Sequence, residues 1–201
     1  MANFLEYDND WRETYLQPGA KSKEWALLID EPVFNVAHFP FLTPEICSLF
    51  IEQAEMKGKW TKGRHEFYPT TDILLRDIGL YELWEGLMND YIHPLAKWFY
   101  ALEGDKYDKM TIEPFIVKYL PREQPQLNFH HDWAQYSTVM TLNEAFTGGG
   151  TYFRRQKQLV KGKPGEISVH PGEISHKHAA RPVLTGTRYV IITFCRNSDY
   201  G

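Results

Sequence analysis

Near residue 111 the sequence changes character, and short β-rich runs separated by turn residues fill the rest of the chain. The runs cover residues 115–120, 136–142, 151–154, 166–170 and 188–194. The turn residues between them include Gly148-Gly149-Gly150, Lys163-Pro164-Gly165, Pro171-Gly172 and Thr185-Gly186. Because no helical segment separates these runs, a parallel Rossmann-type sheet is disfavoured. The pattern predicts a mostly β fold with flanking helices, an antiparallel sandwich or barrel with helices packed outside.

The first half of the chain carries the helical patterns. Thr43-Pro44-Glu45 is typical of a helix start, and the helix is expected to continue to about Lys57, where Gly58 ends it. Apolar residues recur with helical spacing from Leu80 to Leu95, and Pro94 is expected to kink or end that helix. Further upstream, residues 25–30 and 33–36 resemble short strands split by Glu31-Pro32.

Length and composition bound the remaining possibilities. A chain of 201 residues favours one domain, so we expect a single domain over 1–201, with helical support at about 40–105 and a β core at about 111–197. Apolar residues make up 43% of the chain, which is enough for an ordinary core. The net charge of −4 argues against a nucleic-acid partner. No run of apolar residues is long enough to predict insertion into a membrane. Cys47 and Cys195 lie in apolar surroundings and are expected to be buried thiols.

Two histidine-rich segments are candidates for metal chemistry. His130-His131-Asp132 precedes one predicted strand, and His176-Lys177-His178 lies before the last one. In extended backbone, residues i and i+2 point the same way, so His130 and Asp132 can converge on one metal. A histidine 46 residues downstream of Asp132 would complete a face of two histidines and one carboxylate, which suits non-haem Fe(II). The alternative is a polar histidine cluster on the rim of a sheet.

Arg188 opens the last predicted strand, an apolar run over residues 188–194. A buried arginine must be paired or solvated, and its planar fork suits the carboxylate of a cosubstrate. A structural salt bridge to Asp or Glu is an equally good interpretation. Tyr119, at the end of its own strand, could donate a hydrogen bond to the same carboxylate or simply pack in the core.

These patterns occur in an order that resembles one known family. The sequence is similar to the catalytic domain of procollagen-lysine 5-dioxygenases (lysyl hydroxylases), within the Fe(II)- and 2-oxoglutarate-dependent oxygenases. The likeness covers nearly the whole chain, with weaker matches at Asp10-Trp11-Arg12, Cys47 and 69–73. The stronger matches are 115–119, Pro121, Gln124, Leu127, 130–132, 142–143, 148–150, 153–154, 170–172, His176, His178 and 186–189.

The resemblance implies a fold, a cofactor set and a role for five residues. The core would be a double-stranded β-helix, or jelly roll, with the N-terminal helices packed outside. The iron ligands would be His130, Asp132 and His178. Arg188 would anchor 2-oxoglutarate with help from Tyr119, and ascorbate would support turnover. No further catalytic side chain is implied beyond these ligands.

Several positions depart from the family pattern. His131 and His176 match family histidines that are not ligands. Trp133 stands where the family has a small residue and Val139 where it has an asparagine, so substrate identity is less secure than the metal site. The other departures are Thr151, Glu173 and Ala179-Ala180. The ordinary interpretation of Trp133 is a core tryptophan, and the alternative places it at the rim of the pocket.

The resulting hypothesis is a hydroxylase that acts on lysine side chains in collagen-like peptides. The alternatives are hydroxylation of a free amino acid or another peptide residue, and a non-catalytic jelly-roll metal-binding module. The resemblance implies a peptide or amino-acid substrate and pairing as a homodimer. Without a signal peptide the chain as written is expected in the cytoplasm, or in the endoplasmic reticulum lumen if it is excised from a larger secretory-pathway protein.

Overall fold

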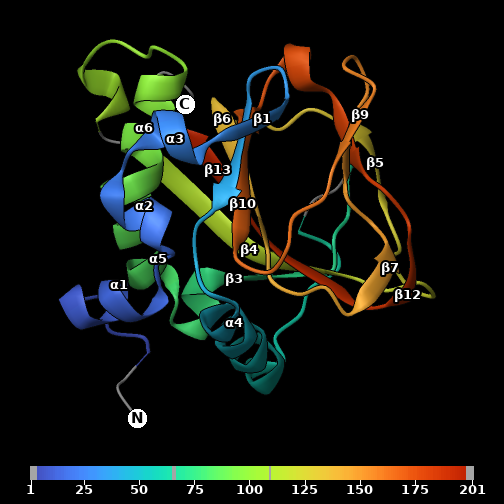
Figure 1. The fold of residues 1–201 in the computed structure, drawn as a ribbon. Coiled ribbons are helices and arrows are strands. Elements are labelled where there is room, and N and C mark those ends of the chain that lie inside the picture. The colour runs from blue at the N-terminus through green and yellow to red at the C-terminus, as the bar shows by residue number, and fades with distance from the viewer. Residues whose placement is uncertain (1–3, 65–66, 109, 198–201) are drawn as a thin grey trace.

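The computed structural model describes residues 4–64, 67–108 and 110–197. Antiparallel strands form one large sheet and two smaller ones, and the helices cover one face of the large sheet (Figure 1). The strands are β1 Asp30–Val33, β2 Val36–Pro40, β3 Asp72–Leu74, β4 Thr111–Tyr119, β5 Leu127–His130, β6 Tyr136–Thr141, β7 Phe146–Gly148, β8 Thr151–Phe153, β9 Gln158–Val160, β10 Glu166–Pro171, β11 His178–Ala180, β12 Val183–Gly186 and β13 Arg188–Arg196.

The large sheet has the strand order β1-β2-β10-β6-β13-β4-β3. A second sheet has the order β5-β11-β8-β9, and β12 pairs with β7. The two long central strands pair without a break from Arg188 opposite Tyr119 to Arg196 opposite Thr111. Every strand pairing among the described residues is antiparallel, so the predicted sheet type and all five predicted C-terminal strands are confirmed.

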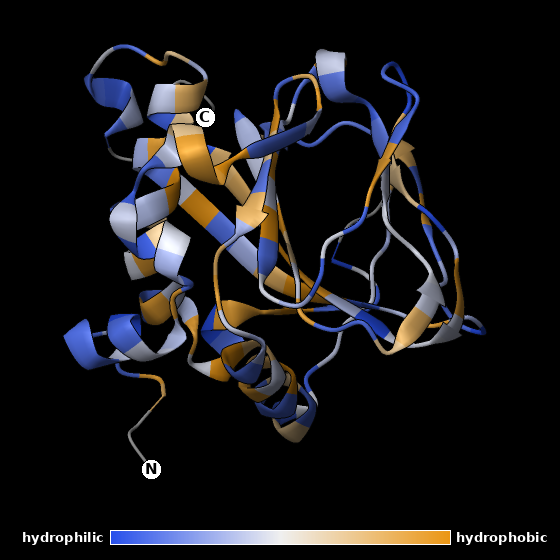
Figure 2. Cartoon of the chain, in the orientation of Figure 1, coloured by the Kyte–Doolittle hydropathy of each residue, from blue (hydrophilic) through white to orange (hydrophobic). Residues whose placement is uncertain are grey.

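The helices form one apolar layer with the inner face of the large sheet. In Figure 2 hydrophobic segments, in orange, lie both on strands of the large sheet and on the helices beside it. The longer helical segments are α1 Asn9–Tyr15, α2 Pro18–Ser22, α3 Trp25–Leu28, α4 Pro44–Lys57, α5 Tyr81–Leu87 and α6 His93–Phe99. Short turns of other helix types are η1 Leu75–Ile78, η2 Met88–Ile92, η3 Asp105–Tyr107 and η4 Ile174–His176. None of the helices in the described residues is long and apolar enough to cross a membrane.

The predicted helix boundaries hold best where capping residues define them. The helix α4 starts at Pro44 and ends at Lys57, and Gly58 adopts a left-handed conformation with φ +62° that a residue with a Cβ would adopt only with strain. The predicted break at Pro94 is instead a widened π turn, in which the His93 N–H bonds to the carbonyl of Met88. This wider turn accommodates the proline, so the helix continues to Phe99.

The strand predictions at 25–30 and 33–36 were wrong. Residues Trp25–Leu28 form one helical turn, α3, in which the Ile29 N–H bonds to the carbonyl of Trp25. The strand β1 starts at Asp30 and includes Glu31-Pro32, and the hairpin turn falls where the second strand was expected. A short apolar run has too few residues to reveal whether its period is helical or extended.

Both cysteines are buried and free, as predicted. Cys47 lies on α4 and Cys195 lies on β13, and both belong to the core between the helices and the large sheet. Burial raises the pKa of the Cys47 thiol to about 12. These thiols therefore act as small apolar side chains.

Candidate active site

A cavity of about 920 Å³ lies between the outer face of the large sheet and the smaller sheets. Alternate residues of β4 and β13 form one wall, because successive side chains of a strand point to opposite faces. The strands β5, β8 and β11 contribute the other wall through residues that include His130, Thr151 and His178. This cavity contains every residue that the sequence singled out for iron and 2-oxoglutarate: Tyr119, His130, Asp132, His178 and Arg188.

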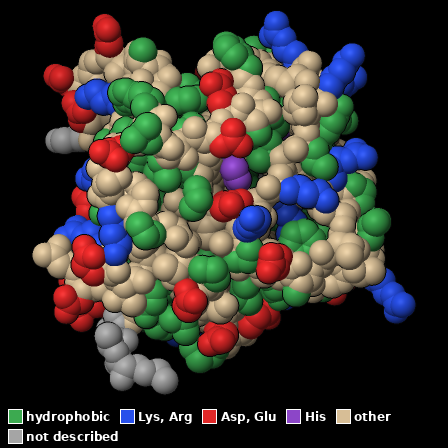
Figure 3. All heavy atoms as spheres, in the orientation of Figure 1, with side chains coloured by type: hydrophobic (Ala, Val, Ile, Leu, Met, Phe, Trp, Pro, Cys, Tyr) green, Lys and Arg blue, Asp and Glu red, His purple; other side chains and the backbone are tan. Residues whose placement is uncertain are grey.

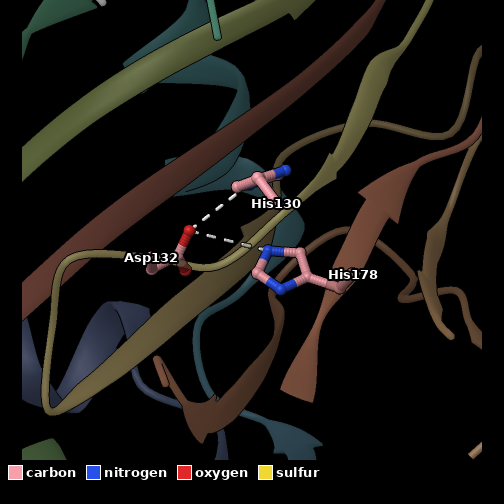
Figure 4. A group of neighbouring side chains, drawn as sticks. All are labelled: His130, Asp132 and His178. Carbon is pink, nitrogen blue, oxygen red and sulfur yellow. Dashed lines mark ion pairs between the residues drawn. The ribbon is translucent and has the colours of Figure 1, made fainter. Parts of the chain in front are cut away.

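The strand pairing brings the three candidate metal ligands together. His130 ends β5 and His178 begins β11, and the two residues are directly opposite in that antiparallel pair. Asp132 follows in the next loop, where its backbone N–H bonds to the carbonyl of Gly172. The Asp132 Oδ1 atom lies 3.3 Å from His130 Nε2 and 3.7 Å from His178 Nε2 (Figure 4). One donor atom from each residue lies within 4.8 Å of the others.

Hydrogen bonds set the tautomers of both histidines. His130 Nδ1 donates to the carbonyl of Asn128 at 2.7 Å, and His178 Nδ1 donates to the carbonyl of His176 at 2.9 Å. A carbonyl oxygen only accepts, so the proton of each neutral ring resides on Nδ1. The lone pair of each Nε2 therefore faces Asp132, which is the arrangement that a metal ion needs.

The electrostatics of the cluster favour an ionised Asp132 carboxylate beside a neutral His178 imidazole. Burial alone would raise the pKa of Asp132, but His178, His130 and His170 hold it well below its usual range. Burial lowers the pKa of His178 to about 3. Burial also acts to lower the pKa of His130, but its hydrogen bond to Asp132 and the charge of that carboxylate outweigh burial and raise it. One carboxylate oxygen and two imidazole nitrogens match the ligand face of non-haem Fe(II) sites.

Sequence reasoning assigned no role to His170, which the structure places against the cluster. Its side chain is fully buried on β10, and its Nε2 lies 3.5 Å from Asp132 Oδ2. The ring packs edge-on against Phe153 and His178. Neither ring nitrogen has a hydrogen-bond partner among the described residues. The only sequence signal was its place in the His170-Pro171-Gly172 match, since a histidine inside an apolar strand has no distinctive spacing.

Arg188 is buried and lines the cavity, directly opposite Tyr119 in the β4–β13 pair. Its guanidinium carbon lies 5.4 Å from the centre of the Tyr119 ring. In the described part of the chain no carboxylate forms an ion pair with Arg188, and burial lowers its pKa. Burial also raises the pKa of Tyr119 to about 12, so the phenol stays protonated and able to donate. The structural salt bridge considered for Arg188 is therefore absent from the described residues.

The glycine run packs against the stem of Arg188. Gly149 has φ +63°, and a Cβ atom built there would lie 3.1 Å from Arg188 Cδ and 2.9 Å from the ring of Phe146. A larger residue would have to displace the arginine or the aromatic ring, apart from the strain of the backbone conformation. The run thus has a packing role beside the candidate cosubstrate site.

The remaining candidates are two histidines that the resemblance does not make ligands and two positions that depart from the family pattern. His131 is exposed at the cavity, whereas His176 is buried and donates through Nε2 to the carbonyl of Phe34, so neither joins the three-residue cluster. Val139 lines the cavity. Trp133 lines the cavity with 73% of its surface exposed. The core interpretation of Trp133 was wrong because the residue lies in the loop after β5, where strand alternation no longer applies.

The fold shows which class of protein the chain is similar to. No protein-family model matches the chain. A 2OG-Fe(II) oxygenase-family oxidoreductase from Burkholderia pseudomallei aligns with a TM-score of 0.61 over 90% of this chain and 92% of that one, at 15% identity. A viral collagen prolyl hydroxylase from Paramecium Bursaria Chlorella virus-1 aligns with a TM-score of 0.55 over 80% and 95%, at 17% identity. The chain has the fold of the 2OG-Fe(II) oxygenases, which confirms the predicted jelly-roll core.

Sequence comparison identifies closer relatives. The multifunctional procollagen lysine hydroxylase and glycosyltransferase LH3 of Rattus norvegicus is 31% identical over 204 residues, and procollagen-lysine,2-oxoglutarate 5-dioxygenase 1 of Gallus gallus is 32% identical over 199. These alignments cover 94% and 92% of this chain. The chain spans 27% of the length of each of these curated relatives. It is homologous to that part of the procollagen-lysine 5-dioxygenases, as the motifs predicted.

Proposed function

We propose that the chain is an Fe(II)- and 2-oxoglutarate-dependent hydroxylase that acts on lysine side chains. The observation that carries the proposal is a buried arginine without a carboxylate partner among the described residues, in the same cavity as two histidines and an aspartate. A purely structural site has no need of such an arginine, because an unpaired buried charge is destabilising. A carboxylate-bearing cosubstrate would satisfy it.

The donor set fits the proposed iron. His130, Asp132 and His178 would hold the metal through Nε2, one carboxylate oxygen and Nε2, and three ligands on one face leave positions for other molecules. Arg188 and Tyr119 would bind the distal carboxylate of 2-oxoglutarate, the arginine through its fork and the tyrosine through its hydroxyl. When bound, iron and 2-oxoglutarate supply the oxygen-activating chemistry that hydroxylates an unactivated C–H bond. Val117 and Val190 line the cavity next to Arg188 and keep this region apolar.

The substrate assignment rests on the relatives, which are named as hydroxylases of procollagen lysine. A lysine side chain in a collagen-like peptide is therefore the first candidate. A free amino acid or another peptide residue is the second, because Trp133 and Val139 line the cavity where the sequence departs from the family pattern.

We also propose that residues 1–201 work as one catalytic domain and pair as a homodimer. The molar mass from light scattering would test the pairing.

Two measurements test the enzymatic proposal. The protein is incubated with Fe(II), ascorbate and 2-oxoglutarate, and succinate is measured without any further substrate. Mass spectrometry then searches free amino acids and Gly-x-Lys peptides for the gain of one oxygen atom. Succinate that disappears in the His130→Ala variant supports the enzyme. Iron binding without succinate formation under any of these conditions would instead support the non-catalytic metal-binding module.

The cellular compartment, cytoplasm or endoplasmic reticulum lumen, stays a prediction from sequence.

A further inference from the structure

The cavity also has a cluster of arginines, far from the single Arg188 along the same strands. On β13 the side chains from Arg188 to Arg196 alternate, and every second one lines the cavity. Arg188 and Arg196 are eight residue steps apart on the strand, which corresponds to roughly 26 Å at about 3.3 Å per residue. Phe115, Val139 and Ile192 line the cavity between these ends. The cavity thus has a basic group at each end of an apolar wall.

At the far end, one carboxylate lies between two guanidinium groups. Glu113 Oε2 accepts from Arg196 Nη1 at 3.1 Å, and Glu113 Oε1 accepts from Arg64 Nη1. Arg196 also donates through Nε to the backbone carbonyl of Trp133 at 2.6 Å. Trp133 directly follows Asp132, so this cluster adjoins the loop that carries the candidate metal ligand. We call Arg64, Glu113 and Arg196 the outer arginine cluster.

The outer arginine cluster has an unused donor. Arg64 Nε donates to the buried Asp72 at 2.7 Å, and Arg64 Nη1 donates to Glu113. Arg64 Nη2 is buried and has no acceptor among the described residues. A buried guanidinium N–H without an acceptor is costly, and the cavity beside it is where an external acceptor could lie. Arg76 also lines this cavity and adds a further positive charge.

The same contacts make the cluster unsuited to an ammonium group. Among the described residues, the carboxylates that line the cavity are Glu113 and Asp132, and each Glu113 oxygen already accepts from an arginine. Asp132 belongs to the candidate metal site. Arg64, Arg76 and Arg196 would repel a cation in this region. A carboxylate would instead be attracted and would receive charge-assisted hydrogen bonds.

We propose that the outer arginine cluster binds a carboxylate of the molecule that is hydroxylated. The inference rests on the proposed function, because it assigns Arg188 to 2-oxoglutarate and the opposite end of the cavity to the substrate. The carboxylate has two sources, the α-carboxylate of a free amino acid and an acidic side chain or C-terminus of a peptide. In either case Arg64 and Arg196 hold the carboxylate, and the apolar wall holds the aliphatic part of the substrate.

The test compares probes that differ only in one carboxylate. Lysine is compared with lysine amide, and the peptide Gly-Asp-Lys amide with Gly-Asn-Lys amide. Binding is measured from the rise in melting temperature with ligand concentration, in parallel with product formation. At least one carboxylate probe is expected to bind roughly ten- to hundredfold more tightly than its amide partner, the difference that one charge-assisted interaction makes. The first pair reports an α-carboxylate, and the second reports an acidic neighbour.

Two variants with opposite expected effects sharpen the test. Arg196→Gln removes one guanidinium from a partly exposed position and should reduce the preference for the carboxylate probe by roughly tenfold or more. Glu113→Gln removes the competing carboxylate and should strengthen that preference. Arg64 is a poorer choice, because its loss would leave the buried Asp72 without its partner. Arg122→Gln, on the exposed loop after β4, is the matched control for loss of one positive charge.

Each outcome has one interpretation. Equal affinity within both probe pairs, or no binding of any probe, overturns the carboxylate site. Loss of lysine binding in Glu113→Gln also overturns it, because Glu113 would then be the acceptor of the lysine ammonium. Succinate formation without substrate is scored separately in the wild-type protein. Its absence would contradict the proposed enzyme, whereas its presence with equal probe affinities would contradict only the outer arginine cluster.

Discussion

The two faces of the large sheet have opposite chemistry although they share the same strands. On β13, Ile191, Thr193 and Cys195 point into the core with the helices, whereas the residues between them line the cavity. The difference comes from the period of two in an extended chain, which assigns neighbouring residues to separate environments. One strand therefore supplies residues both to the core and to the lining of the candidate site. Substitution of one residue or of its neighbour should therefore affect either the stability of the core or the candidate site.

The helix-facing side is apolar and closely packed. Trp84 from α5 is fully buried there, packs against Phe50 and donates through its indole N–H to Thr193 Oγ1 at 2.9 Å. The cavity side instead holds the buried charges of the described residues, which are Asp72, Asp132 and Arg188. Asp72 is paired with Arg64, whereas Asp132 has histidines beside it and Arg188 has no carboxylate partner among the described residues. Incompletely paired buried charges cost stability, so Asp132 and Arg188 mark this face as a binding surface.

The largest effect is expected for removal of a candidate metal ligand. His178→Ala should abolish succinate formation and lower the affinity for Fe(II), because only two of the three donors remain. Titration with Fe(II) under anaerobic conditions and a succinate assay would measure both effects. The variant should keep its overall fold, since the core between the helices and the large sheet is untouched.

His131→Ala is the matched control, because its side chain is exposed at the same cavity and lies outside the three-residue cluster. It should bind Fe(II) as the wild-type protein does. His176→Ala should also keep the metal, with a smaller loss of affinity, because the carbonyl of His176 that holds His178 Nδ1 belongs to the backbone. Equal loss of iron in all three variants would remove the basis for assigning His178 as a ligand.

A pair of adjacent substitutions tests the separation of the two faces. Ile191→Ala should lower the free energy of unfolding by about 2 to 5 kcal/mol, because it leaves a cavity in a fully buried core. Ile192→Ala should cost clearly less, since its side chain is half-buried and faces a space that is already open. Urea denaturation of both variants would measure the difference. Similar losses for the two would show that the cavity wall carries as much of the stability as the helix side.

The sequence predicted features with a local signal and missed those that depend on tertiary contacts. The cap at Thr43-Pro44 and the turn at Gly58 gave α4 its bounds, and the family motifs named the three candidate ligands that the structure brings together. For Trp133 the core was the favoured of two interpretations because large aromatic residues are mostly buried, but its loop position exposes it. Arg64 was missed because its partners, Asp72 and Glu113, are brought to it by pairing of β3 with β4.

Arg188→Lys tests the cosubstrate end of the cavity. Lysine keeps the charge but loses the bidentate fork, so the affinity for 2-oxoglutarate should fall by about one to two orders of magnitude, equivalent to ~1.5 to 3 kcal/mol. Iron affinity should change less, because Arg188 is not among the clustered donors. Titration of 2-oxoglutarate against succinate formation would measure this. An unchanged apparent affinity would assign Arg188 to a different partner.

The smallest effect on stability is expected for Trp133→Ala, at the rim of the cavity. The side chain is 73% exposed, so truncation should change the free energy of unfolding by no more than about 0.5 kcal/mol. Its position on the cavity wall predicts an effect on selectivity instead, because a large ring narrows the approach for a bulky peptide. Hydroxylation of peptidyl lysine should therefore increase relative to that of free lysine. Melting curves and the ratio of the two products would be measured on the same preparation. A loss of ~3 to 5 kcal/mol with an unchanged product ratio would be the behaviour of a core tryptophan and would contradict the rim position.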